Sequence, residues 1–202
     1  MKIKFFDSLP STNKYCELLN LNEVEEFTCY CAHTQTAGIG QGDHLWHSAP
    51  GQNLTFSLVL HPTFLPARLQ FRLTQALSLG ITDWLHSQLS TPHSPLSIKH
   101  PNDIYLGHSK LCGTLITTRL QGQRILHAVA GIGLNLNQTE FPPELPNPIS
   151  LKQITGRDYP LQASLESLLA SLRARYEALR LDPDAPLSDY QKLLYNPTPT
   201  TE

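Results

Sequence analysis

The residues best suited to chemistry lie in one stretch, residues 97–115, with the sequence SIKHPNDIYLGHSKLCGTL. Strand-forming residues alternate there with two polar turns, so Lys110 is expected at the end of a hairpin, three residues before Gly113. A lysine ammonium group is a compact charge that binds phosphate or carboxylate oxygens, and a glycine leaves room for a ligand. The stretch therefore predicts either an anion-binding lysine or an ordinary hairpin with a solvated lysine.

Two glycine-rich segments could approach a ligand closely. Residues 35–47, QTAGIGQGDHLWH, carry three glycines, which predicts a flexible loop without regular structure. No helix pattern follows it, so it is not a dinucleotide-binding fingerprint. Residues 131–137, GIGLNLN, alternate two glycines with two asparagines. That pattern is typical of a strand ending in an amide-rich turn, and it would also suit a strand that lies against a ligand.

Hydrophobic periodicity predicts the elements that must position these segments. Long helices are expected at residues 65–89 and 161–181, which carry apolar stripes at helical spacing. Strands are expected at residues 2–7, 26–34, 53–60, 114–120 and 124–130. In the second of these strands, alternation puts Phe27, Cys29 and Cys31 on one face.

Shorter segments complete the chain. Short helices are expected at residues 11–21, 150–154 and 188–195, and the hydroxyl of Ser11 or Thr12 should cap the first of them. The remaining segments are expected as a turn at residues 91–95, a rigid proline-rich surface loop at residues 139–148 and a flexible tail at residues 196–202.

The composition is that of one globular domain. The chain has 202 residues, of which 40% are hydrophobic, and a net charge of −2, so neither nucleic acid nor an anionic membrane is an expected partner. No apolar run approaches the length of a membrane span. The four cysteines lack metal-binding spacing, and His44 and His47 lack the glutamate of a zinc-binding helix. We therefore expect no protein-held metal and reduced thiols of the kind found in the cytoplasm.

The central stretch resembles the biotin–protein ligases. The match consists of KHPND at residues 99–103 and KLCG at residues 110–113, where the family has a lysine, an aromatic residue, Pro-Asn-Asp and then Lys-x-x-Gly. Shorter matches lie at residues 11–13 (STN), 50–54 (PGQNL) and 131–137 (GIGLNLN). The resemblance extends from residue 2 to about residue 195.

The resemblance implies an α+β fold, a mixed β-sheet packed with helices, like the class II aminoacyl-tRNA synthetases and biotin synthetase. It implies a single catalytic domain over residues 1–195, without an N-terminal DNA-binding domain. The implied reaction is ATP-dependent attachment of biotin to one lysine of the biotin carboxyl carrier protein of acetyl-CoA carboxylase, through biotinyl-AMP, with Mg²⁺ accompanying ATP. Biotin and the carrier are then the partners, DNA and membranes are not, the enzyme is cytoplasmic, and a homodimer is left open.

The resemblance also implies roles for individual residues. Lys110 is the expected catalytic cation. Biotin contacts are expected from polar residues and glycines of the motifs: Ser11, Thr12, Asn13, Gln35, Gly38, Gly40, Trp46, Lys110, Gly113 and Gly133. Nucleotide contacts are expected from Gln41, Asn102, Asp103 and Asn135.

The chain departs from the family pattern in two places. His100 replaces the usual tryptophan of the central motif. Ile39, Gln41 and His44 stand where the glycine-rich loop of the family carries arginines, which help to hold the charge of the adenylate. A structural alternative also remains for Asp103, which would then only hold Lys99 at the turn.

Three functions remain open. The first is a biotin–protein ligase. The second is an acyltransferase of the same fold that handles octanoyl or lipoyl groups. Some of these use a cysteine thioester, but an alternating strand makes Cys112 an ordinary buried thiol more often than a nucleophile. The third is a non-catalytic biotin-binding relative that has lost the loop arginines. The retained Lys110 favours catalysis, and the two asparagine-containing motifs favour biotin over lipoate.

Overall fold

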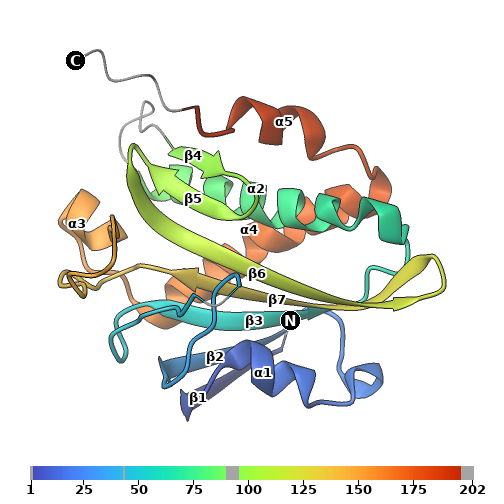
Figure 1. Cartoon of the computed structure of the whole chain (residues 1–202), viewed down its shortest axis with the longest axis horizontal. Coiled ribbons are helices and arrows are strands. Elements are labelled where there is room, and N and C mark those ends of the chain that lie inside the picture. The colour runs from blue at the N-terminus through green and yellow to red at the C-terminus, as the bar shows by residue number, and fades with distance from the viewer. Residues whose placement is uncertain (1, 43, 90–95, 197–202) are drawn as a thin grey trace.

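One mixed sheet with helices on both faces forms the body of the molecule, as the computed structural model of residues 2–42, 44–89 and 96–196 shows (Figure 1). The strands of this seven-stranded sheet are ordered β1-β2-β3-β7-β6-β5-β4. Their bounds are Ile3–Leu9 (β1), Thr28–Gln35 (β2), Leu54–Leu60 (β3), Leu96–Lys99 (β4), Asp103–Leu106 (β5), Ser109–Gln121 (β6) and Arg124–Leu134 (β7). Strands β1 and β2 are parallel, and the other neighbouring pairs are antiparallel. The predicted α+β class is therefore confirmed.

The helices divide unequally between the two faces of the sheet. Their bounds are Thr12–Glu17 (α1), Phe71–Gln88 (α2), Leu151–Thr155 (α3), Leu161–Leu181 (α4) and Leu187–Lys192 (α5). Helices α2 and α4 pack together across one face, and α1 lies on the other (Figure 1). None of the helices in the described part of the chain is long and apolar enough to cross a membrane.

Strand alternation distributes the apolar side chains between two cores, and the predicted shared face of Phe27, Cys29 and Cys31 is confirmed. Phe27, Cys29 and Cys31 lie in the large core beneath α2 and α4. Tyr30 points the other way and packs with Cys16 of α1. The period of two residues in β2 therefore assigns each side chain to its layer.

The predicted boundaries were wrong at two helices. The segment expected as one helix from residue 65 begins instead with a 3-10 turn at Ala67–Leu69, after Pro66, and α2 starts at Phe71. Helix α1 ends at Glu17, and a separate 3-10 turn follows at Leu21–Glu23. The predicted cap is also wrong, because Ser11 occupies the N-cap position without a side-chain capping hydrogen bond. The predicted turn at residues 91–95 and the tail at residues 197–202 lie outside the described residues.

Gly80 sets the closest approach of α2 and α4. A Cβ atom at this position would lie 2.9 Å from the Cα atom of Leu172, on the partner helix. We expect Gly80→Val to lower the free energy of unfolding by about 1–3 kcal/mol, because the added atoms must push the helices apart. Urea denaturation measures the change, with Ala170→Val on the exposed side of α4 as the control. Equal loss of stability in both variants would contradict close packing at Gly80.

Candidate functional site

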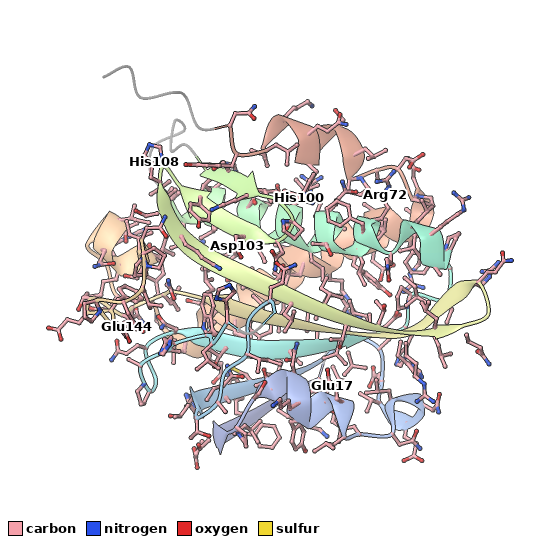
Figure 2. The ribbon with its side chains drawn as sticks, viewed as in Figure 1. Glu17, Arg72, His100, Asp103, His108 and Glu144 are labelled. Carbon is pink, nitrogen blue, oxygen red and sulfur yellow. The ribbon has the colours of Figure 1, made fainter. Side chains whose placement is uncertain are left out.

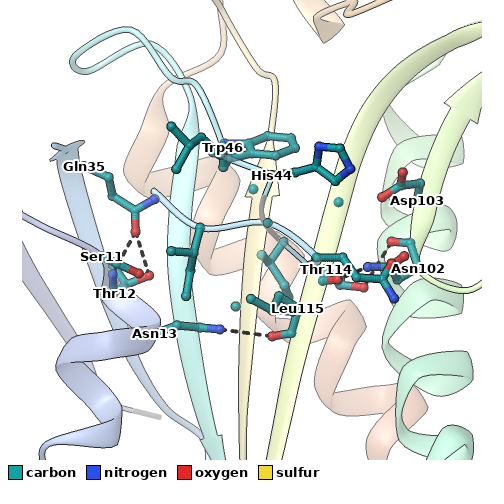
Figure 3. A pocket seen from close by; sticks show the side chains of 18 of the residues that line it. Ser11, Thr12, Asn13, Gln35, His44, Trp46, Asn102, Asp103, Thr114 and Leu115 are labelled. Atoms are coloured by element: carbon teal, nitrogen blue, oxygen red, sulfur yellow. Dashed lines mark hydrogen bonds between the residues drawn. The ribbon is translucent and has the colours of Figure 1, made fainter. Parts of the chain in front are cut away.

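Two adjoining cavities open beside the exposed face of the sheet. Their volumes are about 270 Å³ and 290 Å³. The first extends over α1, β3, β6 and β7 (Figure 3), and the second is lined in part by the proline-rich loop that follows β7. They share His44, Leu45, Trp46, Asp103 and Lys110. A ligand with two parts could therefore occupy both cavities and pass Lys110 at their junction.

The structure brings most of the predicted site residues together. All of them line the first cavity except Gly38 and Asn135. Asn135 lines the second cavity. Gly38 lines neither cavity. A glycine is needed there for the two sides of the loop to approach each other, since a Cβ atom would lie 2.5 Å from the carbonyl oxygen of Trp46. This clustering leaves the binding roles themselves as predictions.

A buried hydrogen-bond network forms one end of the first cavity. Gln35 Oε1 accepts the backbone N–H of Thr12 at 2.8 Å and lies 3.1 Å from its hydroxyl oxygen (Figure 3). Ser57 Oγ lies 2.8 Å from Thr12 Oγ1 and 2.6 Å from Asn13 Oδ1. Asn13 Nδ2 donates to the carbonyl of Leu115 at 3.2 Å. The hydroxyl of Thr12 is thus committed to the site, which explains why it does not serve as a helix cap.

Lys110 forms an ion pair with Asp103 at the junction of the cavities. The distance between Lys110 Nζ and Asp103 Oδ2 is 2.7 Å, and the two side chains are 32% and 24% exposed. The alternative in which Asp103 only holds Lys99 is therefore wrong, because Lys99 instead places its ammonium group 5.3 Å from the ring centroid of Tyr105. Asp103 fixes the lysine that was expected to do chemistry.

A bulge in β6 lets Lys110 and Gly113 face the same cavity. Asp103 pairs with Gly113 and Tyr105 with Lys110, with a register shift between them, so β6 contains one extra residue over this interval. Residues three apart on a regular strand would face opposite ways. Leu111 and Cys112 are both fully buried instead. The Lys-x-x-Gly spacing thus matches a bulged strand.

The proline-rich segment holds the backbone of Lys110. The N–H of Lys110 donates to the carbonyl of Asn147 at 2.7 Å, and its carbonyl accepts the N–H of Ile149 at 3.0 Å. Asn135 Nδ2 donates to the carbonyl of Ile149 at 3.1 Å. Phe141 and other residues of this segment line the second cavity. The segment expected as a surface loop is therefore also a wall of the site.

The glycine-rich loop is a small hairpin, contrary to the prediction of no regular structure. Gly40 N–H donates to the carbonyl of His44 at 2.8 Å, Trp46 N–H donates to the carbonyl of Gly38 at 3.0 Å, and an antiparallel bridge joins Ile39 to Leu45. These hydrogen bonds hold the loop so that the indole of Trp46 packs against the sheet.

Gly133 makes room for the indole of Trp46, which occupies the space above this glycine. A Cβ atom at Gly133 would lie 2.2 Å from Trp46 Cε2. The buried Nε1 of Trp46 has no hydrogen-bond partner in the described structure. The ring of Trp46 therefore forms the wall that both cavities share.

His100, the departure within the central motif, points away from the cavities. Its ring packs 5.2 Å from that of Phe71, between centroids. Asp103, from the other end of the same turn, lies beside the loop that carries Trp46 (Figures 2 and 3). The replacement of tryptophan by histidine therefore changes the packing on α2 and not the lining of either cavity.

The cavities carry little formal charge. Among the described residues that line the two cavities, Asp103 is the one carboxylate and Lys110 the one lysine. Histidines also line the cavities, but no arginine does. Cys112, a neighbour of Lys110, is fully buried. Burial raises the pKa of its thiol well above the usual range, and the Asp103 carboxylate acts in the same direction. Such a thiol is a poor nucleophile.

Sequence reasoning missed several residues of the site. Phe56, Thr114, Leu115, Gly131 and Ile132 also line the first cavity. Ser57 is fully buried in β3 and contacts the side chains of two predicted site residues. Its only sequence signal is a hydroxyl within the largely apolar run of residues 54–60, which also contains Thr55 and suits an ordinary buried strand equally well.

Solved structures share this architecture. The biotin protein ligase from Aquifex aeolicus in complex with biotin and ATP aligns with a TM-score of 0.81 and 25% identity, over 96% of this chain and 78% of that one. The biotin protein ligase from Leishmania major in complex with biotin aligns with a TM-score of 0.80 and 18% identity, over 100% of this chain and 84% of that one. The domain thus has the class II synthetase-like fold of the biotin protein ligases.

Sequence comparison gives the family. The Biotin/lipoate A/B protein ligase family matches residues 5–135, and the chain belongs to this family. The bifunctional ligase/repressor BirA of Bacillus subtilis is 30% identical over 175 residues, which cover 85% of this chain and 53% of that protein. The biotin–[acetyl-CoA-carboxylase] ligase of Paracoccus denitrificans is 31% identical over 156 residues, which cover 73% and 61%. The chain thus spans about half the length of the Bacillus relative.

The contact between Gly133 and Trp46 can be tested by fluorescence. The chain has two tryptophans, so Trp84→Phe leaves Trp46 as the sole indole. In that background Gly133→Ala should shift Trp46 emission to the red and increase its quenching by acrylamide, because the added methyl group must displace the ring. Gly113→Ala is the graded control, since its Cβ would lie 3.2 Å from Trp46 Cζ3, and it should produce a smaller change. An unaltered spectrum in Gly133→Ala would contradict the contact.

Proposed function

We propose that the chain is a biotin–protein ligase, which uses ATP to join biotin to one lysine of a biotin carboxyl carrier protein, such as that of acetyl-CoA carboxylase. The observation that carries the proposal is the position of Lys110, at the junction of two cavities and 2.7 Å from Asp103. A carboxylic acid in one cavity and a nucleotide in the other would meet beside this ammonium group. Family membership and the named relatives support the choice of biotin.

The first cavity suits biotin, an apolar fused ring with a polar ureido group. Thr12, Asn13 and Gln35 supply polar atoms at one end. Ile39, Leu115 and the Trp46 indole supply apolar walls. A mostly apolar site with a few aimed polar groups is the common form of a small-molecule site. We therefore place the fused ring at the Thr12 end and the carboxylate toward Lys110.

The proposed reaction has two steps. A carboxylate oxygen of biotin attacks the α-phosphorus of ATP, and the bond from that phosphorus to the β-phosphate oxygen breaks. Pyrophosphate is released and biotinyl-AMP is formed. The amine of the acceptor lysine then attacks the acyl carbon, the bond to AMP breaks, and the nitrogen loses a proton. Negative charge grows on oxygens in both steps, and Lys110 is positioned to stabilise it more in the transition state than in the ground state.

The second cavity suits the nucleotide. Tyr105, Phe141 and Leu145 provide aromatic and apolar surface, and Asn135 provides an amide. Mg²⁺ would arrive with the phosphates, where it screens their charge and keeps most of its ligands as phosphate oxygens and water. Asp103, which pairs with Lys110, and the adjacent Asn102 carry side-chain oxygens in the wall of the first cavity and could orient such an ion. One carboxylate fits a metal that is held mainly by its substrate.

The buried Cys112 argues against a cysteine thioester mechanism, since all four thiols of the chain are buried. A lipoate or octanoyl transferase of the same fold remains the competing function, because the matched family includes lipoate ligases. The repressor activity in the name of the Bacillus relative belongs to that protein. For this chain we keep the expectations of no operator binding, a cytoplasmic location and an open question of dimerisation.

The activity is tested by incubating the chain with ATP, Mg²⁺, biotin and a biotin carboxyl carrier domain, and then probing with streptavidin. Lipoate and octanoyl donors are tested in parallel. ATP-dependent biotin label on the carrier supports the proposal. Transfer of lipoate or octanoate alone identifies the acyltransferase, and biotin binding without transfer under any of these conditions identifies a non-catalytic relative.

Lys110→Ala should lower the rate of adenylate formation by at least about 100-fold, since removal of one preorganised donor from a transition state costs this much. Pyrophosphate release in the presence of biotin measures it. Lys152→Ala is the matched control, because it breaks a surface ion pair with Asp158, also 2.7 Å long, outside both cavities. Both variants should unfold near the wild-type temperature. A wild-type rate in Lys110→Ala would remove this lysine from the mechanism.

The absence of loop arginines should make the enzyme hold biotinyl-AMP loosely. Ile39 and Gln41 line the first cavity without charge, and a charge-assisted hydrogen bond contributes about 1.5–3 kcal/mol. The adenylate should therefore escape at least roughly tenfold faster than from an arginine-bearing relative. Gln41→Arg should slow the escape and reduce labelling of bystander lysines.

Pulse-chase of labelled adenylate measures this retention. Gln41→Lys is a useful companion, because it restores charge without the planar guanidinium fork. Equal retention by the wild-type chain and an arginine-bearing relative, with no effect of Gln41→Arg, would show that another group holds the adenylate.

A further inference from the structure

The turn at residues 100–102, which joins β4 to β5, is contacted by α5 on the side away from the first cavity. Asn102 and the following Asp103 line the cavity. From α5, the hydroxyl of Tyr190 donates a hydrogen bond to the carbonyl of Pro101 at 3.0 Å. Tyr190 is only 3% exposed, so packing fixes its ring. A side chain of α5 therefore holds the backbone immediately before two residues of the site.

Helix α5 is itself anchored to the long helices and lies beside α2 (Figure 1). Arg175 of α4 pairs with Asp83 of α2 at 2.6 Å and with Asp189 of α5 at 3.0 Å. The ring of Tyr190 lies edge-on to that of Phe71 in α2, with 5.8 Å between the centroids. The body of the fold, and not the turn, therefore sets the position of the Tyr190 hydroxyl.

The segment after α5 also holds the strand that leads into the turn. The N–H of Ile98 in β4 donates to the carbonyl of Leu193 at 2.6 Å, and its carbonyl accepts the N–H of Tyr195 at 3.0 Å. Two consecutive parts of the chain, α5 and the residues after it, thus hold the turn and its incoming strand together.

Thr114 of β6 holds the next residue of the turn from the cavity side. Its N–H and its hydroxyl both donate to the carbonyl of Asn102 at 3.1 Å, and Asn102 Nδ2 donates to the carbonyl of Thr114 (Figure 3). Asp103 follows and places its carboxylate 2.7 Å from Lys110 Nζ. Adjacent residues of the turn are thus held from opposite sides, one by α5 and the other by β6. If either hold were lost, the turn could shift, and the ion pair of Asp103 with Lys110 would shift with it.

We propose that Tyr190 is a positioning residue for adenylate formation, because its hydroxyl fixes the turn from behind so that Asp103 holds Lys110 at the junction of the cavities. The inference rests on the proposed function, which gives Lys110 its role in that step. Tyr190 lines neither cavity, so it acts without touching substrate. A preorganised cation is effective only where charge develops, so a small displacement of Lys110 lowers the rate without weakening the binding of the biotin ring.

Tyr190→Phe tests this role, since it removes the hydroxyl and keeps the ring against Phe71. The kcat of biotin-dependent pyrophosphate release by the full chain, at saturating ATP and Mg²⁺, should fall about three- to tenfold, because the turn relaxes once this neutral hydrogen bond is lost. The affinity for biotin without nucleotide, measured by calorimetry, should change less than about twofold. The polar contacts proposed for the biotin ring come from α1 and β2, and not from the turn.

Tyr176→Phe is the matched control. It removes a buried tyrosine hydroxyl of α4, which donates to Glu26 at 2.7 Å outside both cavities. A hydrogen bond to a carboxylate contributes more to stability than one to a carbonyl, so this control should destabilise the fold at least as much as Tyr190→Phe. Its kcat should nevertheless stay within about twofold of the wild-type value, because the site is distant and shares no partner with it.

A double-mutant cycle shows whether Tyr190 acts through Asp103. Tyr190→Phe is repeated in an Asp103→Asn background, and adenylate formation is measured in single-turnover reactions. Once the carboxylate that holds Lys110 is gone, moving the turn has little left to disturb. The ratio of rates with and without the Tyr190 hydroxyl should therefore shrink to less than about twofold.

The outcomes distinguish the inference from the function on which it rests. A fall in kcat confined to Tyr190→Phe, with biotin affinity kept and a smaller ratio in the Asp103→Asn background, supports the inference. If Asp103→Asn is inactive, the comparison of Tyr190→Phe with Tyr176→Phe decides alone.

Four results overturn the inference while the ligase activity stands. They are an unchanged kcat in Tyr190→Phe, an equal fall in Tyr176→Phe, a loss of biotin affinity that matches the loss of rate, and an undiminished ratio in the Asp103→Asn background. Failure of the wild-type chain to release pyrophosphate with biotin overturns the proposed function and the inference with it.

Discussion

Two glycines on one face of β7 allow the candidate site to be built directly on the sheet. A Cβ atom at Gly131 would lie 2.2 Å from Asn13 Oδ1, and one at Gly133 would lie 2.2 Å from Trp46 Cε2. The alternate residues Ile132 and Leu134 face the core and are almost fully buried. One central strand thus contributes its side chains to the core and its bare backbone to the floor of the cavity, which brings α1 and the glycine-rich loop to opposite sides of one site.

Rigid backbone on both sides of Lys110 fixes where its ammonium group can be. The bulge in β6 turns the lysine toward the cavity, and the bonds to Asn147 and Ile149 hold its backbone from the side opposite β5. The ion pair with Asp103 then limits the side chain. A long flexible lysine ordinarily loses much rotamer entropy when it binds. Here the fold and Asp103 have removed part of that freedom before any ligand arrives, which is the usual requirement for electrostatic stabilisation of a transition state.

Period and turn chemistry were enough to predict most of the helices and strands, and the family resemblance implied their α+β arrangement, but neither predicted the contacts that complete the site. Helix α4 was predicted with its observed ends, because an apolar stripe of that length has one simple interpretation. The bulge at Leu111 was not predicted, since an extra residue in one strand shows only when its partner strand is known. Ser57 and the proline-rich wall were missed for the same reason. Their roles depend on contacts with residues distant in the sequence, and local pattern carries no information about such contacts.

The charge balance of the two cavities determines how much of the proposed chemistry depends on one side chain. Asp103 and Lys110 pair at 2.7 Å, and no arginine lines either cavity in the described ranges. At a distance the opposite charges of the pair largely cancel, so they attract an approaching anion weakly. At contact range the remaining N–H groups of the ammonium still reach a phosphate oxygen. A site of this kind stabilises charge that develops beside Lys110 more effectively than it holds an anion already formed. Accelerating a reaction and retaining its intermediate are therefore separate properties of this fold, and they depend on different residues.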